Sequence, residues 1–160
     1  MSSINQYDNI YNSNIHLIKD GFINIDNYLN GTRIDSRKGI SLIIPITTIN
    51  DFYSNLTKEL MDIDSYQYIY PFDDLHITIF DFIQGTQKYK VSTDDEKKFI
   101  EITTNVLNTI KAFSIEFKGI TFSTAAGMIQ GFDNNKLVDI RANFKNRLFS
   151  KLASHLLPFL

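Results

Sequence analysis

A histidine and a threonine stand two residues apart in an apolar stretch of the chain, Leu75-His76-Ile77-Thr78-Ile79-Phe80. The stretch predicts a β-strand, in which successive side chains point to opposite faces of the sheet. We therefore expect Ile77 and Ile79 to point into a core, while His76 and Thr78 project together into a cleft. An imidazole can move a proton, and a hydroxyl can donate a hydrogen bond to a phosphate oxygen. This pair is suited to chemistry on a phosphate ester.

Phosphoryl chemistry by this device normally takes two such pairs, one on each side of the phosphorus atom. The other histidines do not supply the second pair, because neither His16 nor His155 has a hydroxyl residue two positions further on. The alternative for His76 is a half-buried side chain that bonds to a neighbour. Thr78 would then be present only because threonine suits strands.

Two further side chains are candidates for binding a substrate. Arg141, on the last predicted helix, can pair with a phosphate, although surface arginines are far more often solvated. Arg37, ahead of a predicted strand, is a weaker candidate of the same kind. Tyr70 follows Tyr68 on a possible strand and can stack on a base, although packing is the commoner use of an aromatic ring.

The acidic residues near the motif have simpler interpretations. Asp73 and Asp74 follow Pro71, and a polar turn explains them better than an acid/base or metal pair. Asp81 shares the alternation of Ile79, so we expect it on the face away from His76 and leave it out of the site. The sequence has no cysteine and no His-Glu-x-x-His motif, and we expect neither a metal nor a cofactor.

Composition limits the class of protein. With 160 residues, of which 43% are hydrophobic and 13% aromatic, the chain should be globular with a single core. A net charge of −2 argues against binding duplex nucleic acid but does not exclude a small nucleotide or a short single-stranded RNA end as the ligand. The lack of cysteines and of a signal-like N-terminal segment predicts a cytoplasmic protein. No apolar run approaches the roughly 20 residues that span a bilayer, so we expect no membrane association.

Residue periodicity predicts an α+β protein with an antiparallel or mixed sheet and helices packed on one face. Residues 1–20 are polar and are expected to form a loosely ordered arm, followed by a single domain over 21–160. Strands are predicted over 39–46, which should be buried and central, and over 66–70, 75–83, 113–120 and 127–132. Helices are predicted over 51–61, with Asn50 or Asp51 as N-cap, from 92–94 to about 110, and from 136 to about 157.

Several segments together resemble the two-histidine (2H) phosphoesterase superfamily, which contains RNA-ligase-like proteins and cyclic nucleotide phosphodiesterases. The resemblance covers roughly residues 35–150, and its chemically specific element is the His-x-Thr motif at His76 and Thr78. The segments are Asp35-Ser36-Arg37-Lys38-Gly39-Ile40-Ser41-Leu42, Leu75-His76-Ile77-Thr78, Phe117-Lys118-Gly119-Ile120, Gly127-Met128-Ile129-Gln130-Gly131 and Leu137-Val138-Asp139-Ile140-Arg141.

The resemblance implies a two-lobed fold with one His-x-Thr/Ser motif from each lobe facing a shared cleft. One histidine then acts as general base and the other as general acid, the hydroxyl residues hold the phosphate, and no metal is required. Here only the first motif carries over, to His76 and Thr78. We expect the chain to lack the C-terminal strands that bear the second motif, as a truncated piece, a shortened relative or a protein completed by another subunit.

Two functions follow as hypotheses. The first is a metal-independent phosphodiesterase acting on a cyclic phosphate or phosphodiester of a nucleotide or RNA end. The second is a catalytically inactive module that binds a phosphate, a nucleotide or a protein. Missing strands would leave a sheet edge exposed near the C-terminus, and such edges invite association into a homo-oligomer.

Overall fold

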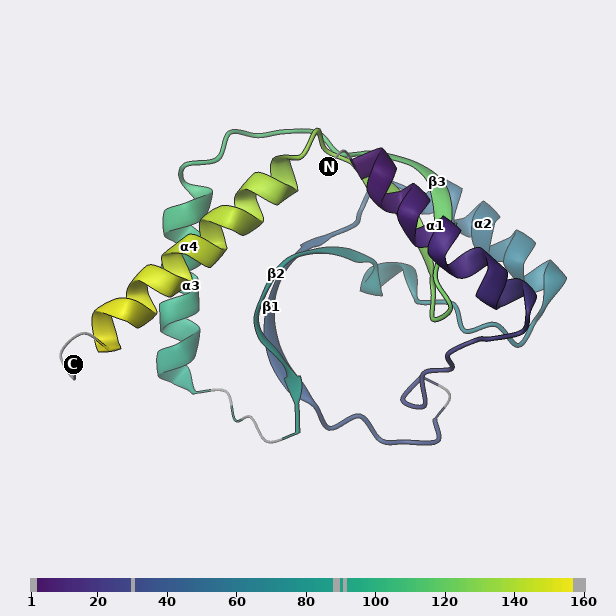
Figure 1. Ribbon diagram of the computed structural model, residues 1–160, viewed down its shortest axis with the longest axis horizontal. Helices are drawn as coiled ribbons and strands as arrows, with labels where there is room; N and C mark the ends of the chain where they lie inside the picture. Colours follow the sequence, from purple (N-terminus) through teal and green to yellow (C-terminus); the bar gives the residue numbers. More distant parts are fainter. Residues whose placement is uncertain (1–2, 30, 88–89, 91, 157–160) are drawn as a thin grey trace. The chain divides into compact units, whose positions relative to one another are not determined.

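The computed structural model describes residues 3–29, 31–87, 90 and 92–156, and within them it forms four α-helices and two small antiparallel sheets (Figure 1). This confirms the coarse α+β class. In chain order the elements are α1 (Ser3–Lys19), β1 (Lys38–Pro45), α2 (Asn50–Ile63), the 3-10 helix η1 (Phe72–Asp74), β2 (His76–Thr86), α3 (Thr93–Leu107), β3 (Glu116–Phe122), β4 (Gly127–Phe132) and α4 (Lys136–Leu156).

The described strands do not form the single sheet that the sequence predicted. β1 pairs with β2 and β3 pairs with β4, each pair antiparallel and two-stranded. The prediction of a buried central strand over 39–46 was therefore wrong. None of the residues of β1 is buried, and from Ile40 onward exposed and half-buried positions alternate. A run of β-branched residues fits a half-exposed strand as well as a buried one, because β-propensity depends on context.

Chain contacts divide the protein into two compact units. The central unit, Tyr28–Asp95, contains β1, α2, η1 and β2. The terminal unit combines Met1–Asn27 with Glu96–Leu160 and contains α1, β3, β4, α4 and nearly all of α3. Most of the apolar side chains that are buried in the described ranges belong to the terminal unit: Ile102, Val106, Leu137, Ile140 and Phe144.

The N-terminal residues differ from the loosely ordered arm expected over 1–20, since most of them form α1. Their asparagines and serines conceal a helical stripe. Half-buried positions recur at spacings of three and four, at Tyr7, Ile10, Asn14, Leu17 and Ile18. Packing of this stripe, rather than intrinsic helix propensity, accounts for the order.

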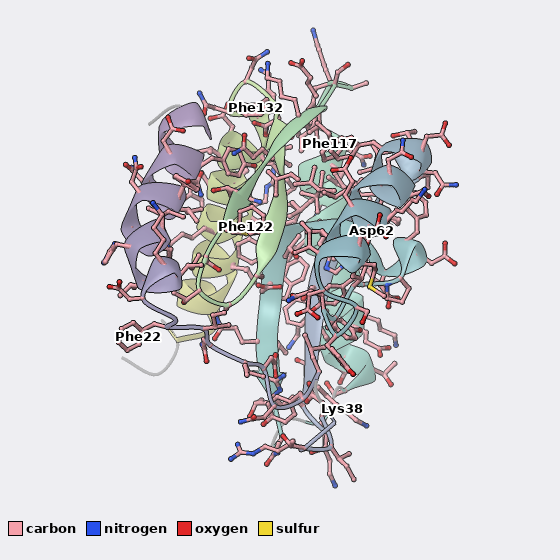
Figure 2. All side chains as sticks on the ribbon, turned by 90° about the vertical axis from the view of Figure 1, so that its right-hand side faces the viewer. Phe22, Lys38, Asp62, Phe117, Phe122 and Phe132 are labelled. Carbon is pink, nitrogen blue, oxygen red and sulfur yellow. The ribbon has the colours of Figure 1, made fainter. Side chains whose placement is uncertain are left out.

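α1 packs on the β3–β4 hairpin through polar contacts as well as apolar ones. The hydroxyl of Tyr7 donates a hydrogen bond to the carbonyl oxygen of Gly131 and accepts one from its amide nitrogen, each at 3.0 Å. The ring of Tyr7 meets that of Phe132 edge to face, with centroids 5.5 Å apart. Figure 2 shows Phe117, Phe122 and Phe132 along this hairpin. Tyr7 thereby provides a hydrogen-bond partner for both backbone groups of Gly131, the residue of β4 opposite Phe117.

α4 begins at Lys136, as predicted, because the preceding residues cap it. Asp133 is 7% exposed, and its carboxylate accepts hydrogen bonds from the amides of Leu137 at 2.6 Å and Asn135 at 3.1 Å. These bonds satisfy amide groups that the first helical turn leaves unpaired. α4 is 21 residues long. Neither α4 nor any other helix in the described ranges combines the length and apolar character needed to cross a membrane.

The segment between β1 and β2 departs from the prediction in two places. α2 begins after Ile49, which makes no side-chain cap bond, so neither Asn50 nor Asp51 is the N-cap. Residues 66–70 form no strand. Asp64 instead directs a turn there, because its carboxylate accepts a hydrogen bond from the amide of Tyr66 at 2.9 Å.

Replacing Tyr7 by phenylalanine keeps the aromatic ring and removes both hydrogen bonds to Gly131. We expect Tyr7→Phe to lower the free energy of unfolding by about 1–3 kcal/mol, because two partly buried backbone groups lose their partner. Hydrogen exchange measured by NMR should show faster exchange of the Gly131 amide. The control is Tyr11→Phe on the same helix, where the side chain is 43% exposed and a change within about 0.5 kcal/mol is expected. Unchanged protection of Gly131 in Tyr7→Phe would contradict this role.

Candidate functional site

His76 and Thr78 lie on one face of the β1–β2 sheet, as the alternation of the strand predicts. The register pairs His76 with Pro45 and Thr78 with Ile43. Pro45 and Ile43 are exposed, whereas Ile44, on the opposite face, is half-buried. His76 is exposed and Thr78 half-buried. We call this surface the histidine face; its residues are Ser41, Ile43 and Pro45 of β1 and His76, Thr78 and Asp81 of β2.

Asp81 belongs to the histidine face because β2 contains a register shift at Ile79. Leu42 pairs with Phe80, and the next residue of β1, Ile43, pairs with Thr78, so that β2 carries one extra residue, Ile79, between these two pairs. One extra residue in a strand reverses the face of every residue beyond it. Asp81 consequently lies opposite Ser41.

A direct contact agrees with this register. The Oγ atom of Ser41 donates a hydrogen bond to Oδ1 of Asp81 at 2.6 Å. Leaving Asp81 out of the site because of its alternation with Ile79 was therefore wrong. Nothing in the sequence signals the extra residue, because alternation in a single strand cannot reveal how its partner is paired.

The imidazole of His76 has a defined orientation. Its Nδ1 atom lies 2.7 Å from the carbonyl oxygen of Asp74, the last residue of η1. A carbonyl oxygen can only accept a hydrogen bond, so Nδ1 carries a proton. In the neutral ring Nε2 is then the unprotonated nitrogen, and it can take a proton from a bound molecule. The turn predicted around Asp73 and Asp74 thus supports the histidine through a backbone carbonyl.

Tyr70 belongs to the same unit as His76 but lies in a loop. Its side chain is 48% exposed, and its ring meets that of Tyr68 edge to face at 5.1 Å. The hydroxyl of Tyr53 donates a hydrogen bond to the carbonyl oxygen of Tyr70. Burial raises the pKa of Tyr53, and the neighbouring Tyr68 raises it further. This bond links the backbone of Tyr70 to α2. Stacking of the Tyr70 ring on a base remains a prediction.

The two arginines singled out in the sequence lie in different units. Arg141 is exposed on α4, in the terminal unit. Arg37 lies in the central unit and is paired with Asp35, with Nε–Oδ1 at 2.9 Å and the terminal nitrogen–Oδ2 contact at 2.7 Å. Its guanidinium also lies 4.1 Å from the ring centroid of Tyr28. Because Asp35 neutralises its charge, Arg37 is a poor phosphate ligand.

Among the described residues, no group of three or more His, Cys, Asp or Glu side chains is arranged to hold a metal ion. The polar groups on the histidine face are an imidazole, two hydroxyls and one carboxylate. They can transfer a proton and form hydrogen bonds to a phosphate and to a donor group beside it.

No known protein family, curated protein or solved structure matches this chain. The resemblance to the 2H phosphoesterases therefore depends on residues of the chain itself, above all on the His-x-Thr motif. Membership in that superfamily remains a prediction.

The register of β1 against β2 requires a glycine at position 39. A Cβ atom on Gly39 would lie 2.6 Å from the carbonyl oxygen of Ile83 and 3.0 Å from the amide nitrogen of Gly85. Both are backbone atoms, so Gly39→Ala must push the strands apart. We expect a loss of about 1–3 kcal/mol in the free energy of unfolding, measured by chemical denaturation.

Gly85→Ala is the matched control for Gly39→Ala. Its nearest atom would be Cβ of Arg37, at an ordinary contact distance of 3.6 Å. A change within about 0.5 kcal/mol is expected there. Equal stability of the two variants would show that the close approach at Gly39 does not constrain the sheet.

The Asp35–Arg37 pair gives a prediction for titration. Hydrogen bonds from the side chain and backbone of Arg37 lower the pKa of Asp35 from 3.8 to about 2. A lowered pKa in the folded state stabilises the fold above the unfolded pKa, and this contribution disappears as the pH falls through about 2. In Arg37→Met, NMR titration should show the pKa of Asp35 raised part of the way towards 3.8, because the side-chain hydrogen bonds are lost while the backbone N–H of residue 37 still donates to Oδ1 of Asp35. An unchanged titration curve would mean that Arg37 does not hold this carboxylate in solution.

Proposed function

We propose that this protein is a metal-independent phosphodiesterase of the 2H type, acting on a cyclic phosphate or phosphodiester of a nucleotide or RNA end. The observation that carries the proposal is the orientation of His76 on an exposed sheet face. Its Nδ1 bond to Asp74 leaves Nε2 to take a proton, and Thr78 lies on the same face. The α+β architecture is compatible with the proposed superfamily.

In this reaction His76 acts as the general base. Nε2 takes a proton from a water molecule as the water oxygen forms a bond to phosphorus. The Thr78 hydroxyl donates a hydrogen bond to a non-bridging oxygen, where negative charge increases in the transition state. The bond from phosphorus to a ribose oxygen then breaks, and that oxygen requires a proton from a general acid.

The general acid is the missing component, because the sequence contains a single His-x-Thr motif. A second copy of the chain can supply it through its own His76. Each described strand pairs with one other strand, so sheet edges remain for association. We propose a homo-oligomer on this ground. Without a second group the rate should fall by about a hundredfold to ten-thousandfold.

The second candidate function is a module that binds a phosphate, a nucleotide or a protein without catalysis. The single motif favours it, since half of the site suffices for binding and not for efficient proton transfer. Because the chain has a net charge of −2, the ligand that we propose for either function is a nucleotide or a single-stranded end rather than a duplex. A cytoplasmic location is part of the proposal.

Hydrolysis of 2′,3′-cyclic nucleotides in the presence of a metal chelator tests the function. We expect His76→Ala to lower kcat/KM by at least about a hundredfold and Thr78→Val to lower it less, because Thr78 binds the phosphate without moving a proton. His16→Ala, on α1 in the terminal unit, is the control and should leave kcat/KM unchanged.

Light scattering of each variant shows whether its oligomeric state is retained. Full activity of a folded His76→Ala variant would refute the enzymatic proposal. Binding of cyclic nucleotides without turnover, abolished in Thr78→Val, would support the binding module instead.

A further inference from the structure

The hydrogen-bonded pair Ser41–Asp81 shares the histidine face with the proposed phosphate site and has no part in the reaction described above. We propose that Asp81, held by Ser41, binds the N–H donors of a guanine base in the nucleotide whose phosphate lies against His76 and Thr78. This inference rests on the proposed function and adds the identity of the base.

The hydrogen-bonding capacity of the pair determines what it can bind. Because the Ser41 hydroxyl donates its proton to Oδ1 of Asp81, the pair offers lone pairs on Oγ, Oδ1 and Oδ2. A carboxylate repels phosphate and accepts hydrogen bonds from neutral N–H groups. The histidine face therefore has two chemically different ends, one suited to a phosphate and the other to a donor-rich group.

β1 provides a measure of the separation between these ends. The partners of His76, Thr78 and Asp81 are Pro45, Ile43 and Ser41, each two residues from the next. At about 3.4 Å per residue, Asp81 lies about 7 Å beyond Thr78 along the sheet. A ribose and base attached to a phosphate at Thr78 can bridge this separation.

The surface beside Thr78 offers an apolar contact to a base. Ile43 lies directly opposite Thr78. It stands two residues along β1 from Ser41, the partner of Asp81, and is 42% exposed. An exposed isoleucine gives the flat face of a base an apolar contact area. From a phosphate site at His76 and Thr78, a bound nucleotide can contact Ile43 beside Thr78 and direct the edge of its base towards Asp81.

Among the four common bases, guanine fits a carboxylate best. Its N1–H and N2–H₂ groups are adjacent donors that face the two oxygens of a carboxylate. Adenine and cytosine present one amino group beside an acceptor nitrogen, and uracil presents one N–H between two carbonyl oxygens. In these three bases a carboxylate would face at least one acceptor and be repelled.

The experiment compares the Kd values of the guanosine, adenosine, cytidine and uridine 2′,3′-cyclic phosphates by calorimetry. We expect the wild-type chain to bind the guanosine compound about tenfold or more tightly than the uridine compound. In Asp81→Asn the preference should disappear, because an amide presents a donor where the carboxylate accepted. Ser41→Ala should reduce the preference less, since the carboxylate remains. Asp73→Asn, an exposed carboxylate on η1, controls for net charge and should keep the wild-type ratio.

Failure of this inference is distinguishable from failure of the proposed function. Equal Kd values for the four compounds, or a preference retained in Asp81→Asn, would refute guanine binding while leaving a phosphate site dependent on His76 and Thr78. If wild-type protein binds none of the four compounds, both proposals fail. A guanosine preference that requires Asp81 would support the inference whether or not the bound compound is hydrolysed.

Discussion

The extra residue of β2 at Ile79 is the constraint on which the candidate site depends. It shifts the register of β2 against β1 by one position, so that Asp81 lies opposite Ser41 on the histidine face. Without this extra residue, Asp81 would lie on the other face of the sheet from His76. With it, an imidazole, two hydroxyls and a carboxylate share one surface. Two-stranded sheets have few contacts to fix their register, so the close approach of the strands at Gly39 is important for keeping these groups together.

The elements with strong periodicity could be predicted from the sequence. α4 begins at the predicted residue, with the expected apolar positions buried at its start, and β4 has the predicted bounds. α3 begins within the predicted range, after Ser92, whose Oγ atom accepts a hydrogen bond from the amide of Asp95 at 3.1 Å. Such helices carry their own start signals and apolar stripes, and these are local properties. The prediction failed where tertiary contacts decide, as in α1, whose polar composition conceals a stripe that only packing on β3 and β4 makes stable.

At the candidate site, the alternation of side chains along the strand predicted their faces correctly where β2 pairs regularly with β1. It placed His76 and Thr78 on one face, because nothing interrupts the strand between them. It could not place Asp81, since a bulge is a property of two strands and the sequence of one does not reveal it. The hydrogen bond from Nδ1 of His76 to Asp74 was equally hidden, because it depends on the backbone path of η1. Such contacts must be read from the structure.

For the proposed reaction, the geometry of phosphoryl transfer requires a catalytic group that the histidine face does not provide. The attacking and leaving oxygens lie on opposite sides of the phosphorus atom, so the base and the acid must approach it from opposite directions. The side chains of the histidine face all project from one side of one sheet. Asp81 therefore cannot replace a second histidine, because it approaches a bound phosphate from the same side as His76. In the proposed reaction the general acid must come from a surface that faces this sheet, and the alternative proposal, binding without catalysis, needs no such surface.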